Sequence, residues 1–129
     1  MRDDLIRYET DMGHGRRPGV RLGVFAAVNT LARRGLLTTE QEAYRRANND
    51  WYDAHVPMPT ATQPTLYSDA CPLAAAWWKV SAAEPLARIP GYLAILDAHG
   101  VAWRARSGED PGEVLYEDDV QVVAVPRDG

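Results

Sequence analysis

The C-terminal quarter of the chain constrains the fold most, because it holds three segments with the pattern of β-strands. In residues 101–106, successive side chains alternate between two faces, as in a strand with one face in water. Residues 109–112 (Glu-Asp-Pro-Gly) have the composition of a turn, and residues 113–117 form the second segment. Residues 120–125 are apolar on both faces except at Gln121, which predicts a strand with neighbours on both sides.

The N-terminal part begins with another predicted strand, residues 4–10, which we place beside the last strand. Residues 11–19 contain three glycines and a proline, so we predict no regular structure there. Pro18 stands where the first turn of a helix can begin, and apolar residues follow it at helical spacing. This predicted helical stripe consists of Val20, Val24, Ala27, Val28 and Leu31.

A second helix is predicted directly after the first. The first helix is expected to end at residues 33–35, two arginines followed by a glycine cap. Thr38 with Gln41, or Thr39 with Glu42, has the spacing of a capping box, which predicts the start of the second helix. Its expected apolar stripe consists of Ala43, Ala47, Trp51 and Ala54. The two helices are therefore predicted to form an antiparallel hairpin.

The middle of the chain is harder to interpret. Residues 58–68 lack periodicity, which predicts a loop that is either a lid or simply irregular. Residues 73–80 are compatible with helix or strand, and we predict a strand. The following helix, residues 81–99, contains Pro90, so it is expected either to be kinked there or to begin in earnest there. That helix can also serve as a crossover that makes residues 73–80 parallel to the strand beginning at Val101.

These elements predict the order β-α-α-β-α-β-β-β and an α+β fold in a single domain, residues 1–129. The expected architecture is a mostly antiparallel sheet of about five short strands, with the helical hairpin and one further helix packed on it. A chain of this length can bury most of its apolar surface without disulfides or metal ions.

Charge and composition exclude several classes of function. A net charge of −4 argues against a protein that binds nucleic acid by neutralising phosphates. No apolar run has the length of a membrane span, and no apolar segment of a signal peptide follows the N-terminal residues. The single cysteine, Cys71, fits a reducing compartment. We therefore predict a cytoplasmic protein with neither nucleic acid nor membrane as a partner.

Parts of the chain resemble a small uncharacterised family from high-GC bacteria. The resemblance is carried by Trp78-Lys79 before a helix, by Asp110-Pro-Gly112 and by residues 116–126 (Tyr-Glu-Asp-Asp-Val-Gln-Val-Val-Ala-Val-Pro). The similarity extends over most of the chain and includes the Gly-Arg-Arg-Pro-Gly segment at residues 15–19. It implies a shared fold, and it implies no activity and no catalytic residues.

The most distinctive local feature is the Gly/Arg segment, residues 13–19. Its glycines allow a ligand to approach the backbone, and Arg16, Arg17 and Arg21 supply charge-assisted donors. With the N-terminus of the expected helix beside it, the segment predicts a site for a phosphate or carboxylate. The alternative is a solvated loop whose arginines pair with the protein's own acids. The segment is not a P-loop, because the Gly-Lys-Ser/Thr sequence is absent.

Residues outside the arginine cluster are also candidates for chemistry or binding. His14, among glycines and near acids, is the candidate acid or base. We include Trp78, Lys79 and Tyr116 as candidate ligand-binding residues, because two adjacent tryptophans in a strand must face opposite sides. One tryptophan can then line a ligand pocket, a homodimer interface or a contact with a protein partner, and the alternative is two ordinary core tryptophans. Cys71 is interpreted as a core cysteine in preference to a nucleophile.

Acidic residues give weaker signals. Glu9, Asp11 and His14 lack the spacing of a metal site, so we predict no metal and no cofactor. Three acids at residues 117–119 can act as paired carboxylates, but a turn is also a natural place for solvated acids. A winged helix-turn-helix is disfavoured by the negative charge.

Two functions remain open at this level. The first is a small binding or interaction module without catalysis, which recognises an anionic small molecule through residues 13–19. The second is a small enzyme acting on a phosphorylated, nucleotide-like or carboxylate substrate, with His14 as acid or base and Arg16 and Arg17 as the anion clamp. Whether the protein is an enzyme is left undecided by the sequence.

Overall fold

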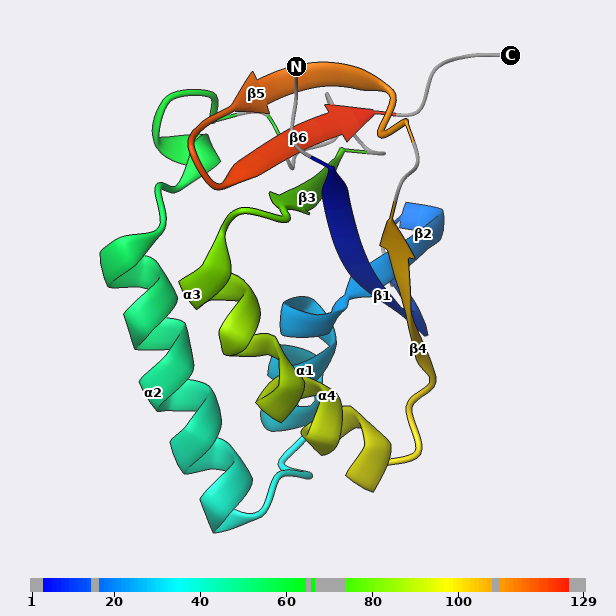
Figure 1. The fold of residues 1–129 in the computed structure, drawn as a ribbon. Helices are drawn as coiled ribbons and strands as arrows, with labels where there is room; N and C mark the ends of the chain where they lie inside the picture. Colours follow the sequence, from blue (N-terminus) through cyan, green and yellow to red (C-terminus); the bar gives the residue numbers. More distant parts are fainter. Residues whose placement is uncertain (1–3, 15–16, 65, 67–73, 108–109, 126–129) are drawn as a thin grey trace. The chain divides into compact units, whose positions relative to one another are not determined.

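The computed structural model describes residues 4–14, 17–64, 66, 74–107 and 110–125 (Figure 1). The chain divides into two compact units, and each is assembled from separate segments. The first unit contains residues 1–7, 56–86 and 106–129, and the second contains residues 8–55 and 87–105. Because the segments interleave, no single point in the sequence divides the chain into two consecutive domains.

The fold class is α+β, and the predicted order of elements is present with strand β2 in addition. The elements are β1 (Leu5–His14), β2 (Arg17–Gly23), α1 (Val24–Arg33), α2 (Thr39–His55), the 3-10 helix η1 (Pro59–Ala61), β3 (Ala75–Lys79), α3 (Ala83–Ala87), α4 (Ile89–Ala98), β4 (Trp103–Ser107), β5 (Glu113–Glu117) and β6 (Gln121–Val125). The strands pair in the order β2-β1-β3-β6-β5, and β4 also pairs with β1.

In the first unit, β6 lies between β3 and β5 and pairs antiparallel with both. This confirms the prediction of an interior strand, and four consecutive residues of β6, from Gln121 to Ala124, are buried. The start of β1 pairs antiparallel with the other edge of β3, with Leu5 opposite Lys79. The prediction that the first strand lies beside the last strand is therefore wrong, because β3 lies between β1 and β6.

The sheet of this unit is apolar on both faces. On one face Trp77 packs with Leu5, Val122 and Ala124. On the other, Val123 packs with Leu66 and Ala74. The strand predicted within residues 73–80 is confirmed as β3, and consecutive side chains in it point to opposite faces because the side-chain period is two.

In the second unit, residues 11–14 and 17–23 form a β-hairpin in place of the irregular segment that we predicted. The pairing of β1 with β2 shifts register on both sides of Gly13, and such irregularities accommodate glycine in a strand. β2 ends the pairing order, and an edge strand tolerates Pro18 because its missing N–H is not needed for a second ladder.

Helix α1 begins at Val24, so the prediction that Pro18 starts it is wrong. Four of the five predicted apolar residues are buried on α1, and Val20 lies in β2. The helix ends as predicted, with Gly35 at a φ of 69°, a left-handed conformation that glycine adopts without strain.

Helix α2 begins at the predicted capping box. The Thr38 N–H donates to Gln41 Oε1 at 2.9 Å, and the Gln41 N–H donates to Thr38 Oγ1 at 3.1 Å. Its predicted apolar face is wrong, because three of the four residues, all of them alanines, are exposed, and Asn48 and Tyr52 are buried instead. The buried face of α2 is thus aromatic and polar, and it is not a stripe of apolar residues.

Helices α1, α2 and α4 contact one another (Figure 1), and α1 also contacts β2. The predicted third helix is divided at Arg88 into α3 and α4, two residues before Pro90. Pro90 occupies the first turn of α4, where its missing N–H costs nothing. α4 buries Ile89, Tyr92, Leu93, Ile95 and Leu96.

Strand β4 pairs with β1. The Asp11 N–H donates to the Ala102 carbonyl at 3.0 Å just before β4 begins. The predicted crossover, which makes residues 73–80 parallel to the strand after Val101, does not require these two strands to pair and stays a prediction. The Arg104 guanidinium binds the buried Glu9 carboxylate at 2.6 Å, which fixes β4 against β1 with an ion pair.

Gly91 offers a test of packing between α2 and α4. A Cβ at this position would overlap the ring of Tyr44, whose hydroxyl donates to the Arg88 carbonyl at 2.6 Å. Glycine to alanine in a helix normally stabilises by about 0.5–1 kcal/mol. We expect Gly91→Ala instead to lower the free energy of unfolding by about 1–3 kcal/mol, measured by urea denaturation.

The control for this test is the same substitution in a Tyr44→Ala background. With the ring removed, Gly91→Ala should be neutral or stabilising. Equal destabilisation in both backgrounds would show that Tyr44 is not the obstacle.

Candidate functional site

The described residues of the Gly/Arg segment lie at the end of β1 and the beginning of β2. His14 pairs with Arg17 across the tip, and Arg16 lies outside the described residues. Arg21 Nη1 donates to the Asp11 carbonyl at 3.0 Å and lies 3.6 Å from its carboxylate. Because α1 begins only at Val24, the hairpin tip lacks the helix N-terminus on which the predicted anion site partly depended. The roles of His14, Arg16 and Arg17 stay predictions.

Trp78, Lys79 and Tyr116 do not all lie on one face of the sheet. Tyr116 packs on the face of Val123, whereas Lys79 lies on the opposite face and binds Glu117 at 2.9 Å. Trp78 pairs with Gln121, so it shares the face of Tyr116. Their predicted roles in binding remain untested predictions, but the two faces of the sheet separate Lys79 from the aromatic pair.

The acids at residues 117–119 stabilise a turn. Asp118 accepts hydrogen bonds from the Val120 and Gln121 N–H groups and from the Tyr116 hydroxyl, at 2.9, 3.0 and 2.7 Å. Burial works to raise the pKa of Asp118, but these hydrogen bonds outweigh it and the pKa is lowered. A carboxylate held ionised in this way caps the turn and is unsuited to act as an acid. Cys71 lies outside the described residues.

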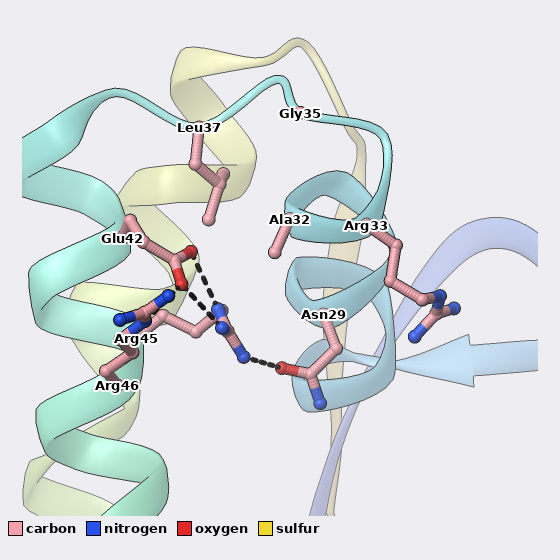
Figure 2. Close-up of a pocket in the computed structure, with 8 residues that line it drawn as sticks. All are labelled: Asn29, Ala32, Arg33, Gly35, Leu37, Glu42, Arg45 and Arg46. Atoms are coloured by element: carbon pink, nitrogen blue, oxygen red, sulfur yellow. Dashed lines mark hydrogen bonds and ion pairs between the residues drawn. The ribbon is translucent and has the colours of Figure 1, made fainter.

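A pocket of about 550 Å³ opens between α1 and α2 in the second unit (Figure 2). It is lined by Asn29, Ala32, Arg33, Gly35, Leu37, Glu42, Arg45 and Arg46. Ala32, Gly35 and Leu37 supply its apolar part, and the remaining side chains are polar or charged. We define these eight residues as the α1–α2 pocket.

Glu42 holds two arginines on the α2 side of this pocket. Its carboxylate accepts Arg45 Nε at 3.0 Å and Arg45 Nη2 at 2.6 Å, and it also accepts Arg46 Nε at 2.8 Å. The spacings i,i+3 and i,i+4 place both arginines on the same side of the helix as Glu42. These hydrogen bonds, from Arg45 first and then Arg46, lower the pKa of Glu42 to about 2.

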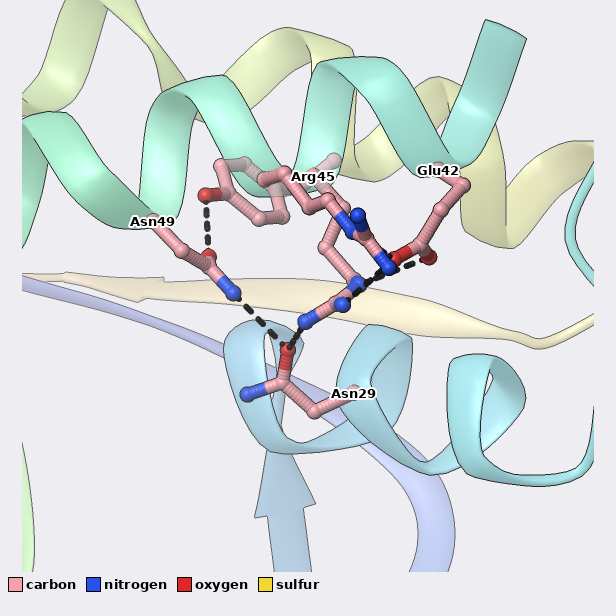
Figure 3. A network of polar contacts seen from close by, with 6 residues as sticks. Asn29, Glu42, Arg45 and Asn49 are labelled. Carbon is pink, nitrogen blue, oxygen red and sulfur yellow. Dashed lines mark hydrogen bonds and ion pairs between the residues drawn. The ribbon is translucent and has the colours of Figure 1, made fainter. Parts of the chain in front are cut away.

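Arg45 crosses the gap to Asn29 on α1 (Figure 3). Asn29 Oδ1 accepts Arg45 Nη1 at 3.1 Å and Asn49 Nδ2 at 3.0 Å. Asn49 Oδ1 in turn accepts the hydroxyl of Tyr92 at 2.6 Å. A chain of hydrogen bonds thus connects a buried tyrosine to the pocket wall.

This network determines which donors of the lining residues keep no partner among the described residues. Since Asn29 Oδ1 accepts two donors, its orientation is set and its Nδ2 group is left without a partner among the residues that the structure describes. Arg46 uses only Nε, so its two outer nitrogens have no partner in the same set. In Figure 2 the Arg33 guanidinium points away from Glu42, and it donates to Thr30 Oγ1 at 2.9 Å. The pocket can therefore donate several hydrogen bonds to an anion.

The described histidines other than His14 lie outside the pocket. His55 Nδ1 donates to the Trp51 carbonyl at 2.8 Å, and its ring stacks on Trp51. His99 Nε2 contacts Gln41 Oε1 at 3.0 Å at the end of α4. Both residues close helix ends, which is the structural role that their positions in the sequence suggest.

No match places the chain among known proteins: no family model, no curated protein and no solved structure matches it. In the part of the chain that the structure describes, no three or more His, Cys, Asp or Glu residues gather to hold a metal ion. None of the helices in that part combines the length and apolar character needed to span a membrane.

The sequence analysis missed the α1–α2 pocket. Glu42, Arg45 and Arg46 carry a local signal, an acid followed at three and four residues by arginines. Asn29, Asn49 and Tyr92 carry none, because their contacts join residues that are 20 and 43 positions apart.

The pKa of Glu42 predicts how stability depends on pH. The folded pKa of about 2 lies below the ordinary value of 4.5, so the stability from ionised Glu42 is present above pH 4.5. It should be lost as the pH falls from 4.5 toward 2. We expect the melting temperature of Glu42→Gln to be lower than wild type at neutral pH, and the difference to shrink below pH 4.5.

The control is Glu40→Gln, which removes an exposed acid from the same turn of α2. It should change the melting temperature little and show no comparable convergence. A difference between wild type and Glu42→Gln that is constant down to about pH 2 would contradict the interpretation of this ion pair.

Proposed function

We propose that this protein is a small cytoplasmic binding module that recognises a small anionic molecule in the α1–α2 pocket. The observation that carries the proposal is the pair Arg45 and Arg46: Glu42 binds both, Asn29 binds Arg45, and Ala32 and Leu37 line the same pocket. Binding sites of this kind combine an apolar cavity with a few oriented polar groups. Arginine suits such a site because its planar guanidinium matches oxyanions and stays charged.

Electrostatics supports an anion over a cation or neutral ligand. The whole protein carries a net charge of −4, yet the pocket lining holds three arginines and one glutamate. Local positive charge in an acidic protein attracts anions at this one place without making the whole surface bind polyanions.

The predicted Gly/Arg site is less suited to this role. The arginine there whose side chain is described, Arg21, pairs with Asp11, and both side chains are largely exposed. Its guanidinium must therefore be ordered by the ligand, whereas Arg45 is ordered in advance by three hydrogen bonds.

The proposal is tested by titrating the 15N-labelled protein with phenyl phosphate, benzoate and sulfate while amide shifts are recorded. We expect saturable shifts for amides in residues 29–46. Arg45→Ala combined with Arg46→Ala should weaken binding at least about tenfold, because each charged hydrogen bond contributes about 1.5–3 kcal/mol.

The matched control is Arg34→Ala. Arg34 is exposed, follows Arg33 directly and does not line the pocket, so its removal changes the net charge but no pocket donor. Equal losses of affinity in both variants would mean that net charge alone attracts the anion. The absence of saturable shifts with all three probes would overturn the proposed function.

A further inference from the structure

The charges that line the α1–α2 pocket do not cancel. Arg33, Arg45 and Arg46 contribute three positive charges against the single negative charge of Glu42, which leaves a net charge of +2. Glu42 stays ionised near neutral pH, because three guanidinium N–H donors occupy its oxygens, and its one negative charge is the most that it can contribute. A ligand with two negative charges brings the lining to neutrality, whereas a monoanion leaves one positive charge uncompensated.

The available donors exceed what a carboxylate can accept. Arg45 keeps one unused N–H on each of its two terminal nitrogens, because Asn29 and Glu42 take one hydrogen from each. The outer nitrogens of Arg46 and the Nδ2 group of Asn29 add further donors among the described residues. A carboxylate offers two oxygens, and a phosphate monoester offers three terminal oxygens that point in different directions.

Arg33 can join these donors when a dianion is present. It donates only one described hydrogen bond, to Thr30 on its own helix, and its side chain is exposed. Its stem already lines the pocket, so a rotation of a solvated side chain brings the third positive charge toward the ligand. Ala32 and Leu37 leave room for a small apolar group on the ester oxygen.

From the charge balance and the donor count of this pocket, we infer that its ligand is the dianion of a small phosphate monoester. This inference rests on the proposed function and adds the charge state and chemical class of the ligand. It implies a preference over carboxylates of the same size, and a dependence of affinity on the ionisation of the ligand.

Isothermal titration of the wild-type protein with phenyl phosphate, benzoate and sulfate tests the inference. A phosphate monoester loses its second proton near pH 6, so the dianion falls about tenfold in population between about pH 7 and pH 5. We expect the affinity for phenyl phosphate to fall about tenfold over that range. Sulfate stays a dianion throughout and should bind with constant affinity, and benzoate should bind more weakly than phenyl phosphate at about pH 7.

The pH dependence caused by ionisable groups of the protein must be distinguished from that caused by the ligand. The charged groups at the pocket are Glu42, Arg45 and Arg46 on α2 and Arg33 on α1, and His99 of α4 contacts Gln41 beside them. The sulfate titration isolates these protein groups, because a protein group that controls binding would change the affinity for sulfate and phosphate in parallel.

The outcomes are distinct. Benzoate binding as tightly as phenyl phosphate, or sulfate following the same pH dependence as phosphate, would overturn the dianion inference and leave the proposed function standing. No binding of any probe would overturn both. Both proposals would be supported if the affinity for phenyl phosphate alone fell between about pH 7 and pH 5. Binding should then be lost in the variant with Arg45→Ala and Arg46→Ala and kept in Arg34→Ala.

Discussion

The second unit depends on the burial of the hydroxyl of Tyr92. The residue is fully buried, and its ring meets Phe25, Tyr44 and Tyr52, with centroids 4.8–6.2 Å apart. A buried hydroxyl without a partner would cost about 1–3 kcal/mol, so the packing of these aromatic rings requires an acceptor beside them. Asn49 supplies it at 2.6 Å. Desolvation raises the pKa of Tyr92, so the phenol stays neutral and remains a donor.

That requirement explains why polar residues line the contact of α1 with α2. Once Asn49 Oδ1 accepts from Tyr92, its Nδ2 group needs an acceptor of its own, and Asn29 provides it. Asn29 Oδ1 then also accepts Arg45, which draws this guanidinium toward α1. The orientation of the pocket donors thus follows from the hydrogen bond that the buried Tyr92 hydroxyl requires. A substitution at Tyr92 is expected to alter the position of Arg45 through the two asparagines.

Structure is predicted correctly from the sequence where neighbours in the chain decide it. The buried run of β6 and the capping box at Thr38 depend on residues within a few positions, and both are confirmed. Prediction from the sequence fails where long-range context decides. Glycines and a proline are compatible with the β1–β2 hairpin because β2 is an edge strand and the pairing shifts register at Gly13. The sequence predicts that α2 buries its alanines, but it is Tyr52 of this helix that packs against Phe25.

The same distinction separates the predicted binding site from the α1–α2 pocket. The sequence shows where glycines and arginines are abundant, and residues 13–19 and 21 satisfy that criterion. It does not show which arginine is ordered before a ligand arrives. Three hydrogen bonds hold the Arg45 side chain, which is 20% exposed. The Arg21 side chain is 54% exposed and lies beside one exposed acid. A side chain ordered by the fold loses little conformational entropy on binding, so affinity is expected to follow preorganisation more closely than the local count of positive charges.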